Sequence, residues 1–307
     1  MKKKPAGKSL RGPLQAPGWA RLGWLAHGFT TRELNLSYSR GQAPGQVTRD
    51  RRAALASLAA RRRWRLVTLR QRHTDIIRLL TRGGLRGRRS LKGLSGACRE
   101  RDGAWKLAGD ALVTDQPGLL LAVQVADCLP ILLIDPVQHV VAAVHAGWRG
   151  TLKRIAEKTV GRMRAEWGSK PRELLAVMGP GIHACCYRVG PEVAEVFSGR
   201  FSNWERFIRR SRPSPPDLLW QQRLRPAPAS QPSERRRARP ALTAPVEETF
   251  HLDLVRANRS QLRAAGLRAS KIHALPLCTA CRTDLLFSHR AEQGRAGRMM
   301  GLVGIVK

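Results

Sequence analysis

The sequence has little acidic charge, few aromatic side chains and few cysteines, and each deficit narrows the classes of protein it can belong to. Its 307 residues include 22 Asp plus Glu against 56 Lys plus Arg, a formal net charge of +34. This excess predicts attraction to anions, including phosphorylated metabolites and nucleic acid. Nucleic-acid readers, however, gather basic residues on one face and interleave aromatics, whereas aromatics make up only 5% here. Because the arginines are scattered along the chain, a generally arginine-rich composition is favoured over specific nucleic-acid binding, and only non-specific binding at low salt is expected.

Long apolar runs are also lacking. No window approaches the ~20 apolar residues of a membrane span, and the basic residues 1–8 are followed by Arg11, Pro13 and Pro17 rather than by the apolar core of a secretion signal. Six cysteines without a small secreted framework fit a reducing compartment, where thiols serve packing, metal binding or catalysis. We therefore expect a cytoplasmic protein with no membrane association.

Mixed strand-like and helix-like segments predict an α/β fold with mixed α+β layers. Short apolar runs at 119–125, 131–134 and 140–144 are typical of strands, and apolar residues three and four apart over 152–167 predict an amphipathic helix. We expect a flexible basic tail at 1–18 and a single catalytic domain at 19–307. Within that domain, residues 211–246 are rich in Pro, Ser and Arg, which predicts a disordered insertion.

A thiol and two imidazoles stand next to strand-like runs. Cys128 and His145 each follow an apolar run, and alternation over 67–73 predicts a strand that carries His73 on the same face as Gln71. Two His and one Cys are three zinc ligands, which leave a fourth position open for water or substrate. A lone His or Cys is more commonly a packed core residue, so the combination matters more than any one of them.

Residues next to these three suggest supporting roles. Asp127 could orient a ligand imidazole or accept a proton. In HAGWRG, a strand passes into a helix whose N-terminal N–H groups, together with Arg149, could hold a phosphate or carboxylate. In FSHR, Ser288 and Arg290 are of the kind that contacts a ribose or phosphate, although a surface loop would look the same.

The remaining cysteines give a weaker signal. Cys278 and Cys281 have the spacing of half a zinc ribbon, but the chain has no second C-x-x-C to match them. The adjacent Cys185 and Cys186 do not easily chelate one metal and are interpreted as packing residues. A second, structural zinc is therefore disfavoured by the sequence.

Several of these motifs together resemble one known family. The segments HGFTTR, LNLS, QRH, ADCLP, HAGWRG, GPGIHACCYRVG, CTAC and FSHR are similar to the YfiH/DUF152 family, also called the laccase-domain or polyphenol-oxidase family, over roughly 28–306 apart from the insertion. The resemblance implies an α/β sandwich of the YfiH type with a single active site. It also implies one zinc per chain, held by His73, Cys128 and His145, which would form the catalytic centre.

The same resemblance implies an activity. The family's chemistry would be phosphorolysis of adenosine, inosine, guanosine and 5′-methylthioadenosine, with phosphate as co-substrate, and hydrolytic deamination of adenosine. Substrate contacts are expected from Asn35 and Ser37 in LNLS and from Arg51, besides Arg149, Ser288 and Arg290. The general acid is unassigned, with Cys128 and Asp127 as candidates.

The chain departs from the family pattern at several positions. The residue after the first zinc histidine is Thr74 rather than Gly, Arg188 replaces an acidic residue, and the run after LNLS loses its acidic end. The expected Asn-Arg pair before the first helix is Asp50 and Arg51. The three ligands are retained, so metal binding is expected, whereas the changes after LNLS and before Arg51 bear on substrate contacts and substrate preference.

Three alternatives use the same residues or the same charge. A copper oxidase of phenols needs many imidazoles, usually in H-x-H pairs, and none of the eight histidines forms such a pair, so copper is disfavoured. A non-enzymatic, basic nucleic-acid-binding protein with a structural metal would gather its arginines on one face. A cysteine hydrolase using Cys128 with His145 would be active without metal.

Overall fold

The computed structural model describes residues 12–38, 43–58, 64–82, 91–92, 96–211 and 249–306. These residues divide into a larger unit, which ends at Cys186 and resumes at Asp253, and a smaller unit, Tyr187–Leu252. Most of the expected basic tail and almost all of the expected insertion at 211–246 lie outside the described residues. The single catalytic domain at 19–307 therefore stays a prediction.

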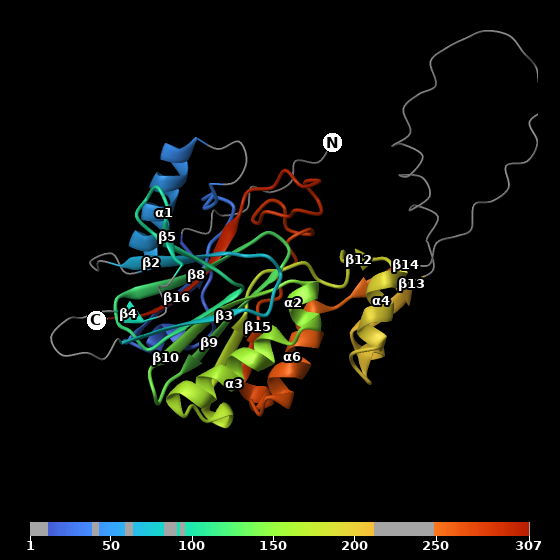
Figure 1. Ribbon diagram of the computed structural model, residues 1–307. Helices are drawn as coiled ribbons and strands as arrows, with labels where there is room; N and C mark the ends of the chain where they lie inside the picture. The colour runs from blue at the N-terminus through green and yellow to red at the C-terminus, as the bar shows by residue number, and fades with distance from the viewer. Residues whose placement is uncertain are drawn as a thin grey trace, which may run out of the picture. The chain divides into compact units, whose positions relative to one another are not determined.

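The larger unit is built on two mixed sheets (Figure 1). In order across the first, six-stranded sheet lie β1 (Leu25–Phe29), β16 (Met299–Ile305), β8 (Leu119–Val125), β2 (Arg65–Arg70), β6 (Trp105–Ala108) and β5 (Cys98–Arg99). In order across the second, seven-stranded sheet lie β15 (Ile272–Ala274), β11 (Leu175–Met178), β9 (Leu129–Asp135), β10 (Val140–Ala146), β7 (Ala111–Thr114), β3 (Ile77–Arg82) and β4 (Leu91–Lys92).

Helices cover the outer faces of the two sheets. On the side of the six-stranded sheet lies α1 (Pro44–Leu58), and against the seven-stranded sheet pack α2 (Trp148–Leu152), α3 (Ile155–Trp167) and α6 (Leu254–Ala264) (Figure 1). Short 3₁₀ turns occur at Trp19–Arg21, Pro171–Glu173 and Ala269–Lys271. The unit is thus an α/β sandwich, as the sequence predicts. None of the helices in the described ranges is long and apolar enough to cross a membrane.

Side chains of β8 alternate between the two apolar layers of this sandwich. Leu121 packs between the sheets with side chains such as Leu132, whereas Leu120 joins the layer under α1 that includes Ala54. A strand with both faces buried is apolar at every position rather than at every second one. This double burial explains the continuous apolar runs, and the strands expected at 119–125, 131–134 and 140–144 are confirmed.

Two expected elements differ from the structure, each because one residue adopts a left-handed backbone. The strand expected over 67–73 ends at Arg70, and the chain then turns through His73, which has φ 58°. The helix expected over 152–167 is split into α2 and α3, because Arg154 between them has φ 61°. The N–H of Arg154 caps the first of these helices by donating to Thr151 O at 3.0 Å.

The smaller unit contains a three-stranded antiparallel sheet in the order β12 (Arg188–Val189), β14 (Thr249–Leu252) and β13 (Ile208–Ser211). It also contains α4 (Pro191–Ser198) and a 3₁₀ turn at Trp204–Arg206. Its apolar centre includes three phenylalanines. The ring centroid of Phe201 lies 5.5 Å from that of Phe197 and 5.8 Å from that of Phe207.

Two links between the sheets of the larger unit leave from the same end of the sandwich. The strands β2 and β8 are parallel neighbours, with Val67 opposite Leu121, so their carboxyl ends lie together. The chain passes from β2 to β3 and from β8 to β9, and each passage crosses from the six-stranded to the seven-stranded sheet. Because β10 runs antiparallel to β9, with His145 opposite Pro130, the end of β10 returns to this same place. Three distant segments of the chain therefore meet here.

Candidate metal centre

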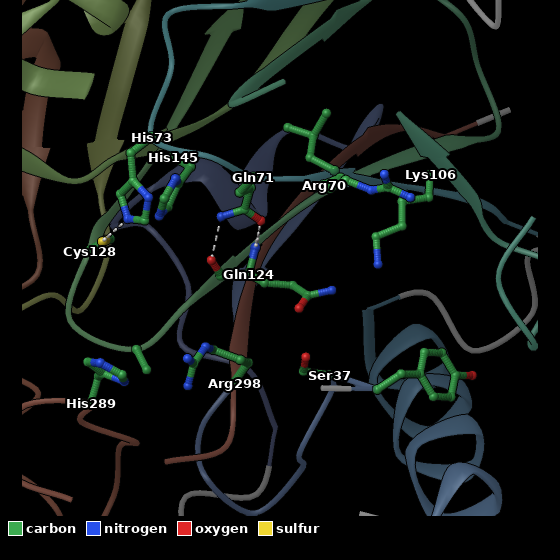
Figure 2. A pocket seen from close by; sticks show the side chains of 13 residues that line it. Ser37, Arg70, Gln71, His73, Lys106, Gln124, Cys128, His145, His289 and Arg298 are labelled. Carbon is green, nitrogen blue, oxygen red and sulfur yellow. Dashed lines mark hydrogen bonds between the residues drawn. The ribbon is translucent and has the colours of Figure 1, made fainter. Parts of the chain in front are cut away.

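A thiol and two imidazoles meet where the three segments converge. His73 lies in the first link, Cys128 in the second and His145 at the end of β10, and one ligand atom from each lies within 4.8 Å of the others. Cys128 Sγ is 3.6 Å from His73 Nε2, and the two imidazole rings are 5.0 Å apart between centroids (Figure 2). The structure thus brings together all three of the ligands expected from the sequence.

The buried carboxylate of Asp110 organises two of these three ligands. It accepts hydrogen bonds from the backbone N–H groups of Arg72, His73 and Thr74 at 3.2, 3.0 and 2.7 Å, and from the Thr74 hydroxyl at 2.6 Å. It also lies 2.9 Å from His145 Nδ1. These donors outweigh the effect of burial and hold the pKa of Asp110 well below its usual range.

This contact also fixes the proton on His145. An ionised carboxylate can only accept hydrogen bonds, so Nδ1 of His145 must donate to Asp110. The other ring nitrogen, Nε2, is then the one that faces Cys128 and can offer a lone pair to a metal. A second hydrogen bond of this kind is what ligating histidines ordinarily have.

Gly147 provides the space in which the thiol and one imidazole approach each other. A Cβ atom at this position would lie 2.9 Å from Cys128 Sγ and 2.9 Å from His73 Cδ2. The backbone of Gly147 has an ordinary φ of −73°, so a larger residue is excluded by contact and not by conformation. The first glycine in HAGWRG therefore allows these two side chains to approach each other.

Without a metal, Cys128 and His145 form an ion pair. Burial opposes ionisation of the Cys128 thiol, but the charge and hydrogen bond of His145 lower its pKa to about 6. Burial likewise opposes protonation of His145, yet the Cys128 thiolate and the Asp110 carboxylate raise its pKa to about 9. At neutral pH the thiol is therefore ionised, which is the form that both metal binding and nucleophilic attack require.

Asp127 has a different role from the one its position suggests. Its backbone is left-handed, with φ 86°, and its carboxylate accepts hydrogen bonds from Thr279 Oγ at 2.6 Å, Ser288 Oγ at 2.8 Å and Arg290 N at 2.6 Å. The imidazole of His145 is oriented by Asp110 instead. Asp127 therefore anchors the loop after β15 beside Cys128.

A cavity of about 550 Å³ opens next to the three ligands. Figure 2 shows His73, Cys128 and His145 at one end and Arg70 and Lys106 at the opposite end. The remaining lining residues are Ser37, Tyr38, Leu69, Gln71, Gln124, Ala126, His289 and Arg298.

Two of the lining residues, Gln71 and Gln124, are hydrogen-bonded to each other. The side chain of Gln71 donates to Gln124 O at 2.7 Å and accepts from Gln124 N at 2.8 Å, so it pairs with the β8 backbone (Figure 2). The side-chain amide of Gln124 is not used in these two bonds and extends into the cavity (Figure 2). An amide offers both donors and an acceptor, which suits the polar edge of a planar heterocycle.

Among the residues expected to contact substrate, Ser37 lines the cavity, whereas Asn35 supports it from behind by accepting from Arg298 N at 3.0 Å. Arg51 is buried and pairs with Glu100 and Asp102 at 2.8 and 3.0 Å. Its guanidinium also lies 4.5 Å from the centroid of the lining residue Tyr38.

The other three expected contacts do not line the cavity either. Arg149 is exposed and lies over the ring of Trp148, 4.3 Å from its centroid. Ser288 and the backbone of Arg290 are hydrogen-bonded to Asp127. In FSHR, the residue that lines the cavity is His289, between those two.

Positive charge in the cavity comes from residues that the sequence did not single out, namely Arg70, Lys106 and Arg298. Lys106 and Glu100 form an ion pair at 2.8 Å. No motif marks these three residues. Asp110, in contrast, had a visible signal, since an acidic residue between Gly109 and the mostly apolar run 111–114 is a costly choice unless its carboxylate has partners.

Comparison with known proteins agrees with this geometry. A family model described as multi-copper polyphenol oxidoreductase laccase matches residues 21–306. The chain belongs to this family. The crystal structure of Bacillus licheniformis hypothetical protein YfiH superimposes with a TM-score of 0.70 at 28% identity, covering 94% of each chain. The resemblance to the YfiH/DUF152 family and its sandwich fold are thus confirmed.

Two curated proteins that are similar to this chain have names that specify an activity. A purine nucleoside phosphorylase, YlmD, of Bacillus subtilis is 32% identical over 198 residues, 64% of this chain and 59% of the relative. An adenosine deaminase, RL5, of an unknown prokaryotic organism is 33% identical over 189 residues, 62% of this chain and 59% of the relative. The matched part of the chain therefore spans about 59% of the length of either relative.

Proposed function

We propose that this protein is a zinc-dependent purine nucleoside enzyme, which carries out phosphorolysis of purine nucleosides and hydrolytic deamination of adenosine. The observation that carries the proposal is the cavity itself, with a His, Cys, His cluster at one end and cationic side chains at the other. Its volume of about 550 Å³ lies within the range of small-molecule sites. The names of the two relatives support this class of substrate.

The donor set fits zinc. Two imidazoles and one thiolate are ordinary zinc ligands, the pKa of Cys128 is lowered to about 6, and Asp110 leaves Nε2 of His145 able to coordinate. We propose that His73, Cys128 and His145 hold one zinc ion. When bound, zinc would act as a Lewis acid with a coordination position left for water or substrate.

The protein's own residues would then bind and orient the substrates. Arg70, Lys106 and Arg298 carry the positive charge that a phosphate co-substrate needs, and they replace Arg149 as its proposed site. The amide of Gln124 is suited to the edge of the purine. Because Gln71 is doubly bonded to the β8 backbone, this part of the cavity needs little reorganisation on binding.

The test uses purified, metal-replete protein incubated with adenosine, with and without phosphate. Adenine and ribose 1-phosphate that form only with phosphate would report phosphorolysis, and inosine that forms without phosphate would report deamination. Cys128→Ala should remove both activities, whereas Cys98→Ser, at an exposed cysteine on β5, should remove neither. Folded, metal-replete protein that gives none of these products would contradict the proposal.

The ion pair of Cys128 and His145 favours one second candidate, a cysteine hydrolase, because a thiolate next to an imidazolium is the usual state of a nucleophilic cysteine. The two functions respond oppositely to metal. Removal of the metal by a chelator should abolish activity of the zinc enzyme and leave that of a cysteine hydrolase intact.

A further inference from the structure

Four cysteines form a second cluster of potential metal ligands in the larger unit, and none of the four lines the cavity. Cys185 and Cys186 come from the loop after β11, and Cys278 and Cys281 from the loop after β15. The four sulfur atoms lie within 4.8 Å of one another. Cys281 Sγ is 3.6 Å from Cys185 Sγ and 3.3 Å from Cys186 Sγ.

The backbone brings the two loops together independently of the thiols. Gly181 pairs with Cys278 in an isolated parallel bridge, and Thr279 N donates to Gly181 O at 3.0 Å. A turn over 184–186, in which Cys186 N donates to His183 O at 2.9 Å, lets two adjacent cysteines reach the same point. The sequence-based objection that neighbouring cysteines do not easily chelate one metal is thereby removed.

Packing does not account for this cluster. A cysteine that serves as a small hydrophobe is buried, but Cys185 and Cys281 are exposed and Cys186 is only partly buried. A disulfide would use two of the four sulfurs and requires about 2.05 Å between them, whereas all four cysteines are free thiols. Four sulfurs around a zinc at about 2.3 Å would lie about 3.8 Å apart at the corners of a tetrahedron, close to the separations observed.

The hydrogen bond to Cys278 also fits a ligand sulfur. The N–H of His183 donates to Cys278 Sγ at 3.4 Å, and outer hydrogen bonds of this type orient and stabilise ligating groups. A site with four thiolates selects soft, tetrahedral cations, of which zinc is the most common.

We propose that Cys185, Cys186, Cys278 and Cys281 bind a structural zinc ion. This second zinc would fasten the loop after β15, in which Thr279 and Ser288 donate to the Asp127 carboxylate next to Cys128. Its role is separate from the proposed catalysis. It holds in place the loop that carries the cavity residue His289.

The experiment measures zinc per chain in full-length protein that is purified with reductant from zinc-supplemented cells. Wild type should bind two zinc ions, Cys128→Ala one, the double variant Cys278→Ser/Cys281→Ser one, and Cys98→Ser two. X-ray absorption at the zinc edge of the Cys128→Ala protein should show a shell of four sulfurs at about 2.3 Å. This last measurement leaves the four-cysteine cluster intact, so it decides the question even if the double variant does not fold.

Three results would overturn the proposal: Cys128→Ala protein without zinc, zinc in that protein with nitrogen or oxygen in its shell, or a disulfide between two of the four cysteines. A protein that shows the all-sulfur shell but converts no nucleoside would contradict the proposed function alone. An active protein whose Cys128→Ala variant holds no zinc would contradict this inference alone.

Discussion

Replacement of Asp110 by asparagine tests how the candidate site is organised. In the wild type, one carboxylate oxygen receives His73 N–H and lies next to His145 Nδ1, and the other receives three donors from Arg72 and Thr74. Asparagine has the same shape but only one acceptor oxygen. Its NH₂ group would therefore face either two or three donor groups, whichever way the amide is turned.

The less costly orientation turns the NH₂ group toward His145. Nδ1 can then accept a hydrogen bond only if the proton moves to Nε2, which removes the lone pair proposed to bind zinc. Asp110 is fully buried, and breaking a buried charged pair costs about 3–5 kcal/mol. We expect Asp110→Asn to lower the free energy of unfolding by about 3 kcal/mol and the zinc affinity of the His, Cys, His site by about 10- to 100-fold.

Urea denaturation of the metal-free protein measures the first quantity, and competition with a zinc chelator measures the second. The matched control is Asp75→Asn, which removes a carboxylate in the same link between β2 and β3 that forms an exposed ion pair with Lys158. Exposed pairs contribute about 0–1 kcal/mol, so this control should change the stability little. If Asp110→Asn were as stable as Asp75→Asn and bound zinc as tightly as wild type, the proposed role of Asp110 would be wrong.

Three further predictions follow from single residues. Gly147→Ala should abolish zinc binding at the His, Cys, His site, because its Cβ would lie 2.9 Å from Cys128 Sγ. The control is Gly161→Ala in the middle of α3, where a Cβ meets no other atom, so this variant should stabilise the protein by about 0.5–1 kcal/mol. Equal zinc content in the two variants would refute the prediction. In metal-free protein, the ultraviolet absorbance of the Cys128 thiolate, taken as wild type minus Cys128→Ala, should rise as pH increases through about 6, and a midpoint near 9 would exclude the ion pair. Burial lowers the pKa of His27 from 6.5 to about 4, so between these two pH values the imidazole is protonated in the unfolded chain but not in the folded protein. The free energy of unfolding of wild type, relative to that of His27→Gln, should therefore fall by up to about 3 kcal/mol as pH decreases from 6.5 to 4. A difference between the two proteins that does not depend on pH would refute this prediction.

The sequence predicted the sandwich well because its strands are buried on both faces. The continuous apolar runs of β8, β9 and β10 have few alternatives to central strands, so their positions could be identified without knowledge of the tertiary structure. The boundaries near the site were less predictable. Nothing in QRH indicates that the chain leaves the strand at Arg70, because this turn depends on the Asp110 carboxylate, 38 residues from Arg72 in the sequence.

The ligand set could be proposed because thiols and imidazoles are rare and chemically distinctive. The cavity walls could not, because Arg70, Lys106 and Arg298 are three among 56 basic residues. The roles of Asp110 and Asp127 show the same limit: each of these carboxylates lies near the ligands, and only their hydrogen-bond partners distinguish the one that orients His145.

The position of β16 has a consequence for how the protein is made. This strand pairs with both β1 and β8, so the six-stranded sheet has a gap between these two strands until the polypeptide has been synthesised through Ile305. A nascent chain that already contains His73, Cys128 and His145 would still lack β16. It would therefore lack the support that aligns the two links in which His73 and Cys128 lie. Such long-range pairing is slow and exposes unpaired strand edges. Binding of the proposed metal is therefore expected only after β16 has joined the sheet, and a premature stop before Met299 should yield a chain that aggregates instead of a partly active one.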